Sequence, residues 1–295
     1  MEKTDAMERA EKTADTVPPE NYTGEPAREN AREKSAVIVG ASSGIGYETA
    51  LRLLGKGYTV SNISRTPCTL GRVRNYKADV SAGSSLEKAV CEAVSAVGGE
   101  LDALIYCAGF SMAAPLEYAE EKDYRYLFDV NFFGAVRAIQ SAVPYMKGKG
   151  GRIVLVSSMG SLFPVAFDSF YSSSKAAVDM LVKSAALELE PYNIRVCSVQ
   201  PGGTSTAFTF KRKIYGDAKN KDYAEKVKLA ASALADMEQG GMSAGEVARS
   251  VAEAVCGKNP PLLLQCGGWN KFCAMAKRVL PDKAAQYLNK RIYKQ

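Results

Sequence analysis

From residue 35 onward, short apolar runs alternate along the chain with stretches whose apolar positions recur at helical spacing. The first run, SAVIVGA, is continuously apolar and ends in glycine, as expected for a parallel strand that is buried on both faces. Six further runs follow, so the pattern predicts seven strands. They cover 35–41, 58–64, 73–79, 102–109, 151–158, 193–201 and 261–267.

Stretches with helical periodicity separate these strands. They cover 44–57, 84–97, about 120–148 with a break near Pro144, 169–190, 205–238 and 243–256. Strand, helix and strand repeated in this way predict an α/β fold, a single Rossmann-like doubly wound parallel sheet with helices on both faces. We expect one domain, 35–267, to carry the whole pattern.

The two ends of the chain differ from this domain in composition. Residues 1–34 hold nine acidic and six basic side chains and no Leu, Ile, Phe or Trp, so they are expected to form a disordered or frayed tail. Residues 268–295 form a basic extension in which apolar side chains such as Trp269 and Phe272 alternate with Lys and Arg. Such an extension could cover a pocket, support an oligomer or lie on a membrane surface, and the sequence leaves these three uses open.

The bulk composition, with 46% hydrophobic and 24% charged residues, is that of a soluble globular protein. No apolar run reaches the length of a membrane span and no signal peptide is recognisable, which predicts a cytoplasmic protein. The seven cysteines are scattered without a CxxC pair, which favours reduced thiols over disulfides or a zinc site. The chain contains no histidine, which excludes a Ser-His-Asp triad and His-ligated metal. We expect neither a metal nor a nucleic-acid partner.

The stretch GASSGIG, at 40–46, follows the first predicted strand and opens the first predicted helix. Gly40 permits a tight turn, Gly44 lets the backbone approach a pyrophosphate, and Gly46 allows close packing of helix on strand. The N-terminus of the helix adds partial positive charge. The position of this turn predicts a dinucleotide site, to which Ser42, Ser43 and Ile45 also belong.

The end of the second predicted strand carries Ser64 and Arg65. An NAD-binding unit usually places an acidic residue here, about 20 positions after the glycines, to bind the ribose 2′-hydroxyl. A guanidinium instead offers a 2′-phosphate a bidentate, fully charged partner. This pair therefore predicts NADP(H) as the cofactor, with an ordinary surface arginine as the alternative.

In YSSSK, at 171–175, Tyr171 and Lys175 share one face of a predicted helix, and Ser158 ends the preceding strand. A free phenol has a pKa near 10, and we expect the Lys175 ammonium and the nicotinamide charge to lower the pKa of Tyr171. The Tyr-x-x-x-Lys pattern is weak by itself. Together with the glycine turn, the serine and the absence of histidine, it indicates proton transfer by tyrosine.

With ADV at 78–80, VNFFG around Asn131 and PGGTST at 201–206, these motifs resemble the short-chain dehydrogenase/reductase family, from Ser35 to about Gly267. The C-terminal run also resembles relatives that act on steroids, retinoids or other lipids. The resemblance implies that Tyr171 is the general acid/base, that Lys175 lowers its pKa and holds the nicotinamide ribose, and that Ser158 orients the substrate carbonyl.

The resemblance also implies that Asn131 bends its helix and holds a water in a proton relay. It assigns adenine contacts to Asp79 and Val80, a close backbone approach to the cofactor to Ala108 and Gly109, and the nicotinamide carboxamide and phosphate side to the stretch from Pro201 to Thr206. The remaining cofactor residues implied are Gly202, Thr204, Asn131, Tyr171 and Lys175.

Two positions depart from the family pattern. Val39 stands where the family usually has a threonine, and YCAG at 106–109 replaces NNAG. Ala108 and Gly109 keep the close backbone approach, whereas the two asparagines that tie neighbouring strands are missing. We expect a locally rewired sheet with cofactor binding retained.

The loops beyond the strand ends offer an apolar set of substrate contacts. It comprises Phe110, Met112, Met159, Leu162, Phe163, Phe167, Phe208 and Phe210. Such a pocket suits an apolar carbonyl or secondary alcohol, which predicts an NADP(H)-dependent oxidoreductase and, by the resemblance, a homodimer or homotetramer. The alternatives are that these side chains pack on one another, that the enzyme is an epimerase or dehydratase on the same fold, or that the protein is a non-catalytic NADP(H)-responsive binding module.

Overall fold

The computed structural model describes residues 33–209, 212–215 and 221–281, together with Lys283, Ala284, Tyr287 and Lys290. Residues 1–32 of the expected N-terminal tail therefore lie outside the described residues. Phe210 and most of the chain beyond 281 lie outside them as well.

In the part of the chain that the structure describes, one parallel sheet of seven strands has the order β11-β7-β6-β4-β1-β2-β3. Its strands are β1 (Lys34–Val39), β2 (Tyr58–Ser64), β3 (Arg74–Lys77), β4 (Ala103–Tyr106), β6 (Gly151–Val156), β7 (Ile194–Gln200) and β11 (Leu263–Gln265). All seven predicted strands are confirmed. The strand order reverses between β1 and β4, which is where doubly wound sheets bind ligands.

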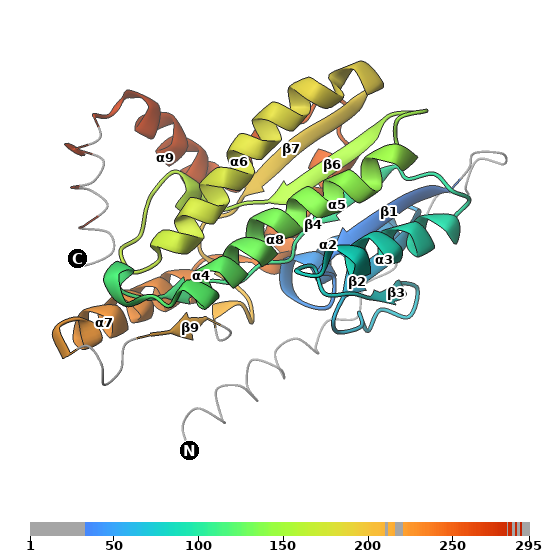
Figure 1. Cartoon of the computed structure of the whole chain (residues 1–295). Helices are drawn as coiled ribbons and strands as arrows, with labels where there is room; N and C mark the ends of the chain where they lie inside the picture. Colours follow the sequence, from blue (N-terminus) through green and yellow to red (C-terminus); the bar gives the residue numbers. More distant parts are fainter. Residues whose placement is uncertain are drawn as a thin grey trace. The chain divides into compact units, whose positions relative to one another are not determined.

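Helices cover both faces of the sheet, as predicted (Figure 1). Helices α3 (Gly83–Ser95), α5 (Gly134–Ala142) and α6 (Ser169–Leu189) pack on one face and share a hydrophobic core with it. Helices α2 (Gly44–Gly55) and α8 (Ala244–Cys256) pack on the other face over a second core. The Rossmann-like α/β fold class is thereby confirmed.

The helix expected over 120–148 is divided into four pieces. Helix α4 (Glu121–Phe128) runs into a π-helical turn at Asp129–Phe133, then into α5 and a 3-10 turn at Val143–Tyr145. Pro144 lies in that last turn, where its missing N–H ends the regular helix. The π-helical turn contains Asn131, so the helix is distorted at the residue expected to bend it.

Tyr106, the first residue of YCAG, stands where the family pattern has an asparagine, and it connects the sheet to the neighbouring helix. Its buried hydroxyl donates a hydrogen bond to the carbonyl oxygen of Val130 in the π-helical turn. A Cβ on Gly134 would lie 2.2 Å from that hydroxyl oxygen, so glycine makes room for the contact. The strand pairing itself stays regular through Tyr106. The strand pairing therefore does not show the locally rewired sheet that was expected, and the described change at Tyr106 is a contact from sheet to helix.

The helix predicted at 205–238 is confirmed only for its second part, α7 (Lys221–Gln239). The prediction is wrong for the described residues before it, which contain the short strands β8 (Thr204–Ser205) and β9 (Lys213–Ile214). Strand β8 pairs with β10 (Met242–Ser243) and β9 with β5 (Met112–Ala113). These partners lie far away in sequence, so helical periodicity could not reveal the pairing.

Candidate active site

A cavity of about 1190 Å³ opens at the carboxyl ends of the central strands. It is lined by segments that directly follow β1, β2, β4, β6 and β7. Every cofactor residue predicted from the sequence lines it except Asn131. These are Gly40, Ser42, Ser43, Gly44, Ile45, Gly46, Ser64, Arg65, Asp79, Val80, Ala108, Gly109, Tyr171, Lys175, Pro201, Gly202, Thr204 and Thr206.

The glycine turn after β1 is required by the packing around it. Gly40 has φ +95°, and a Cβ there would lie 2.9 Å from the backbone nitrogen of Ala108. A Cβ on Gly46 would lie 2.1 Å from the carbonyl oxygen of Gly40. Side chains at these two positions would push the turn and α2 away from the sheet, so glycine keeps the backbone close to the cavity.

The N-terminus of α2 fits a phosphate group. Ser43 is the N-cap residue, and its side chain makes no capping hydrogen bond. The first N–H groups of the helix therefore remain open to a ligand in the cavity, and an anion is the ligand that such groups favour. The turn itself is held by Asn62, whose Oδ1 accepts a 2.9 Å hydrogen bond from the N–H of Ala41.

Arg65 lies at the rim of the cavity, at the end of β2. Its exposed guanidinium donates a 3.2 Å hydrogen bond to the hydroxyl of Tyr126, while the Ser64 hydroxyl donates to the carbonyl of Thr66. Asp79 lies in the same wall, and hydrogen bonds from the side chain and backbone of Ser81 hold the pKa of its carboxyl below the usual value. Arg65 thus places a positive charge at the rim of the cavity, next to the end of β2.

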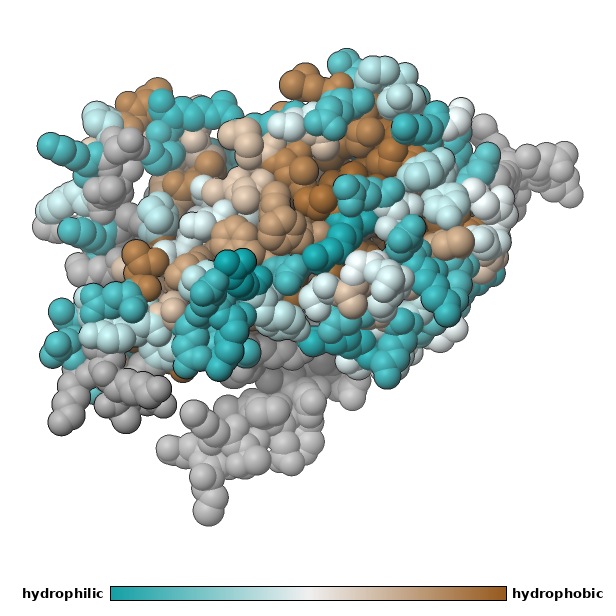
Figure 2. All heavy atoms as spheres, viewed as in Figure 1, coloured by the Kyte–Doolittle hydropathy of each residue, from teal (hydrophilic) through white to brown (hydrophobic). Residues whose placement is uncertain are grey.

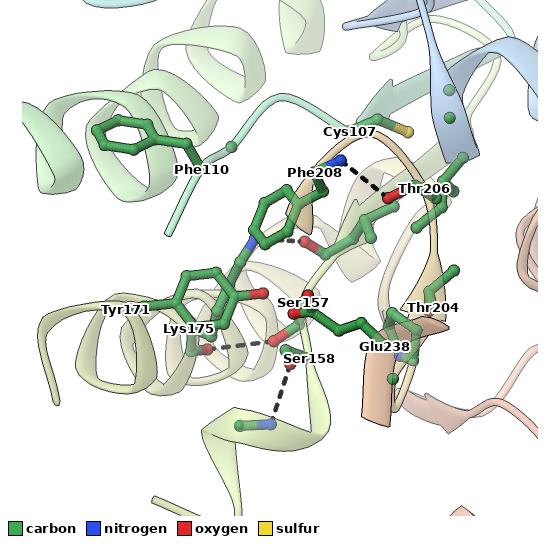
Figure 3. A pocket seen from close by; sticks show the side chains of 18 of the residues that line it. Cys107, Phe110, Ser157, Ser158, Tyr171, Lys175, Thr204, Thr206, Phe208 and Glu238 are labelled. Atoms are coloured by element: carbon green, nitrogen blue, oxygen red, sulfur yellow. Dashed lines mark hydrogen bonds between the residues drawn. The ribbon is translucent and has the colours of Figure 1, made fainter. Parts of the chain in front are cut away.

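Tyr171 and Ser158 face the cavity together (Figure 3). Burial of the Tyr171 hydroxyl raises its pKa above the usual value, and a hydrogen bond with the side chain of Ser158 opposes that shift. The charges of Asp168 and Glu238 raise the pKa further. In this structure burial therefore has a larger effect on the pKa of Tyr171 than the hydrogen bond that lowers it.

Lys175, one turn further along α6, is buried with 5% exposure. Its Nζ donates a 2.8 Å hydrogen bond to the carbonyl oxygen of Val156 and lies 5.7 Å from the centroid of the Tyr171 ring. Burial lowers the pKa of Lys175 to about 8, and the charge of Asp179 opposes the shift. The ammonium is thus held beside the phenol by the end of β6.

Asn131 lies behind the cavity wall and is fully buried. Its Oδ1 accepts a 3.0 Å hydrogen bond from the N–H of Phe110, and its Nδ2 donates to the carbonyl of Phe110 and to the hydroxyl of Ser174. These bonds tie the loop after β4 to α6. The structure therefore places Asn131 as a residue that positions the wall next to Gly109 rather than as a wall residue.

The structure also reveals a buried polar cluster that sequence reasoning missed, which we call the acidic cluster. Ser111 Oγ donates a 2.7 Å hydrogen bond to Asp168 Oδ1 and accepts a 3.1 Å bond from Arg212 Nε. Arg212 also donates to Glu238, which accepts a second bond from Thr209. Asp168 and Glu238 both line the cavity. In the sequence, the position of Asp168 three residues before Tyr171 was the one feature that could have indicated this cluster.

The predicted apolar contacts divide into two groups. Phe110, Met159, Phe163 and Phe208 line the cavity, and the ring of Phe208 lies 5.9 Å from that of Tyr171. The other described members do not line it: Met112 is in the core, Leu162 lies outside the wall, and Phe167 lines a separate small cavity with Leu116 and Tyr223. Helix α9 (Gly268–Val279) contributes Trp269, Asn270 and Cys273 to the wall.

Comparison with known proteins agrees with this geometry. The family model for short chain dehydrogenases matches residues 34–214. The 3-ketodihydrosphingosine reductase of Bacteroides thetaiotaomicron is 35% identical over 255 residues, which cover 85% of this chain and 94% of that protein. Human retinol dehydrogenase 8 is 33% identical over 195 residues, which cover 61% of this chain and 62% of that protein.

A solved structure shows the same fold. The short-chain dehydrogenase from Streptomyces avermitilis superposes with a TM-score of 0.74 at 27% sequence identity. The match covers 88% of this chain and 96% of that one.

Proposed function

The chain belongs to the short-chain dehydrogenase family, whose members are oxidoreductases that use a nicotinamide cofactor, and we propose that it is an NADP(H)-dependent reductase of an apolar, lipid-like ketone. One observation carries this proposal. The same cavity holds the open N-terminus of α2, the Ser158–Tyr171–Lys175 group and a wall of aromatic and sulfur-containing side chains.

The cofactor preference follows from charge at the end of β2. At the end of β2, where NAD-binding units usually have an acidic residue, the cavity is lined by Ser64 and by the positively charged Arg65. A ribose 2′-phosphate gains a charge-assisted partner from this arrangement, whereas a free 2′-hydroxyl loses the usual acceptor. This supports NADP(H) as the cofactor.

Three residues of the cavity act on the substrate and the cofactor in the proposed reaction. NADPH, when bound, supplies the hydride. Tyr171 donates its proton to the carbonyl oxygen of the substrate, and the Ser158 hydroxyl donates a hydrogen bond to the same atom. The Lys175 ammonium stabilises the phenolate that remains, and it holds the ribose of the cofactor.

The protonation state of Tyr171 favours the reductive direction. Because burial raises its pKa, the phenol carries its proton at neutral pH. A protonated phenol is ready to donate to a developing alkoxide, whereas oxidation of an alcohol requires the phenolate first. We therefore propose reduction as the direction of the reaction, with Tyr171 as the proton donor.

The substrate class follows from the wall of the cavity. Phe110, Met159, Phe163 and Phe208 offer apolar, adaptable surface beside Tyr171. The relatives named for 3-ketodihydrosphingosine and retinol support a lipid-like ketone rather than a sugar.

Consumption of NADPH and NADH with a panel of long-chain, polycyclic and sugar ketones tests the proposal. We expect turnover with NADPH and an apolar ketone. Cofactor binding without turnover on any ketone would favour a binding module, and product formation without net oxidation of NADPH would favour an epimerase or dehydratase.

We also propose that the protein works as a homodimer or homotetramer in the cytoplasm. Hydrophobic residues gather over α5 and α6 (Figure 2). Met180 and Leu187 of α6 are exposed, as is Phe133 in the π-helical turn before α5. All seven cysteines are free thiols, which suits a reducing compartment. Among the described helices, none has both the length and the apolar character needed to cross a bilayer. The molecular mass in solution of the wild type and of Met180→Glu tests the oligomer.

A further inference from the structure

Asp168 carries a buried carboxyl group that forms no salt bridge with the described residues. It is the N-cap residue of α6 and only 4% exposed, yet its side chain makes no capping hydrogen bond with its own helix. Its carboxyl instead lies in the wall of the cavity that contains Tyr171. An N-cap aspartate usually accepts from the first N–H groups of its helix, so this orientation calls for another reason.

The acidic cluster contains two carboxyl groups, those of Asp168 and Glu238, and one guanidinium group, that of Arg212. Arg212 and Glu238, both 8% exposed, form an ion pair and so neutralise each other. Among the described residues, Asp168 receives one side-chain hydrogen bond, from the neutral hydroxyl of Ser111 to Oδ1. A buried charge without a charged partner is costly, and burial accordingly raises the pKa of this carboxyl to about 7. A cation in the cavity would remove that cost.

The position of Asp168 defines which part of a substrate it meets. Asp168 is the N-cap of α6 and Tyr171 is the third residue of that helix, and the charge of Asp168 raises the pKa of Tyr171, so the two side chains lie close enough to interact. A substrate whose carbonyl accepts the proton of Tyr171 therefore presents a substituent near that carbonyl to Asp168. Glu238 lines the same cavity (Figure 3).

We propose that Asp168 is the specificity-determining residue of this site and that it binds a protonated amine close to the carbonyl that is reduced. The substrate class is thus a long-chain amino ketone, whose ammonium pairs with Asp168 and whose alkyl chain lies on the apolar wall. This inference rests on the proposed ketone reduction and adds the amine to it. The network of Ser111, Arg212 and Glu238 holds the carboxyl in place.

A matched pair of substrates tests this inference at about pH 7. One is a long-chain 2-amino-3-ketone, and the other is the same ketone without the amino group. The wild-type enzyme should prefer the amino ketone by about tenfold or more in kcat/KM, because a charge-assisted pair forms only with the ammonium. Asp168→Asn should abolish this preference, and Asp168→Glu should restore part of it.

Asp236→Asn is the matched control, because it removes one exposed carboxylate from α7, outside the cavity wall. The preference of this variant for the amino ketone should equal that of the wild type. Thermal melting and NADPH binding of Asp168→Asn show whether the variant is folded, and Asp168→Glu remains informative if it is not.

The outcomes separate this inference from the proposed function. If neither ketone is reduced by the wild-type enzyme with NADPH, the proposed function fails. If both are reduced and the preference is absent, or if it survives in Asp168→Asn, the amine site is wrong while ketone reduction stands. An equal loss on both substrates in Asp168→Asn, with no change in their ratio, would also overturn the amine site and assign Asp168 to positioning Tyr171.

Discussion

The Nζ of Lys175 lies 5.7 Å from the centroid of the Tyr171 ring, and it is held there by a 2.8 Å hydrogen bond to the carbonyl of Val156. The bond fixes the lysine to the end of β6 rather than to the phenol. Its ammonium is therefore held by the protein itself, and burial raises the pKa of the neighbouring phenol. This geometry supports the proposed roles, in which Tyr171 donates a proton and Lys175 stabilises the phenolate that remains.

Tyr171→Phe should reduce turnover by about 10²–10⁴-fold, because the variant loses the proton that a general acid supplies. The ring remains to pack beside Phe208, so the binding of NADPH, measured by fluorescence titration, should change little. Tyr124→Phe is the matched control, since the Tyr124 ring stacks on Phe170 outside the cavity wall. Near-normal turnover in Tyr171→Phe would contradict the proposed acid.

The kcat/KM for NADPH should fall as the pH rises above about 8. This parameter reports groups of the free enzyme, in which burial lowers the pKa of Lys175 to about 8. Above that pH the lysine loses the charge that holds the cofactor and the phenolate. Tyr171 adds no loss in this range, because its pKa is raised.

Lys175→Arg is the control for this pH dependence. A guanidinium stays charged throughout, so any activity that the variant keeps should decline only at higher pH. A pH profile of the wild-type enzyme that stays flat well above the pKa of Lys175 would show that the charge of this lysine is not required.

Arg65→Asp should reverse the preference between the two cofactors. The wild-type enzyme should bind NADPH about tenfold or more tightly than NADH, since charge-assisted hydrogen bonds contribute about 1.5–3 kcal/mol. The aspartate repels a 2′-phosphate and accepts from a 2′-hydroxyl. Arg72→Asp makes the same change of charge at an exposed position outside the wall and should leave the ratio unchanged. Equal dissociation constants in the wild-type enzyme would refute the role of Arg65.

Local sequence predicted the fold because the signals that define it are local. A buried parallel strand is a short apolar run, and a glycine such as Gly40 after the first run indicates a turn at a cofactor. Tyr171 and Lys175 are one helical turn apart, so their joint position follows from helix geometry alone. Ser158 and Arg65 could be found because each lies at or just beyond the end of a strand that the apolar pattern predicts.

The features that sequence did not predict depend on residues far apart in the chain. Ser111 contacts Asp168 across 57 positions and Arg212 across 101, and no periodicity connects them. The pKa of Tyr171 depends on how deeply its hydroxyl is buried, and this depth is a property of the assembled cavity. The expectation from charge did not include this burial, and the effect of the nicotinamide charge on the pKa stays a prediction.

The contact between Tyr106 and the π-helical turn should contribute measurably to stability. Tyr106→Phe leaves the carbonyl of Val130 without this buried partner, which should lower the free energy of unfolding by about 1–3 kcal/mol. Gly134→Ala places a Cβ 2.2 Å from the Tyr106 hydroxyl oxygen, and such overpacking costs about 1–3 kcal/mol. Urea unfolding measures both. Gly55→Ala is the control, because a Cβ there meets no atom within 4 Å.

The double variant Tyr106→Phe, Gly134→Ala distinguishes this contact from two unrelated defects. Phenylalanine lacks the oxygen that the new Cβ would meet, and the nearest remaining ring atom, Cζ, lies 3.2 Å away. The second substitution should therefore cost less in the presence of the first, with a coupling of about 0.5 kcal/mol or more. Strictly additive losses would mean that the hydroxyl does not determine the packing at Gly134.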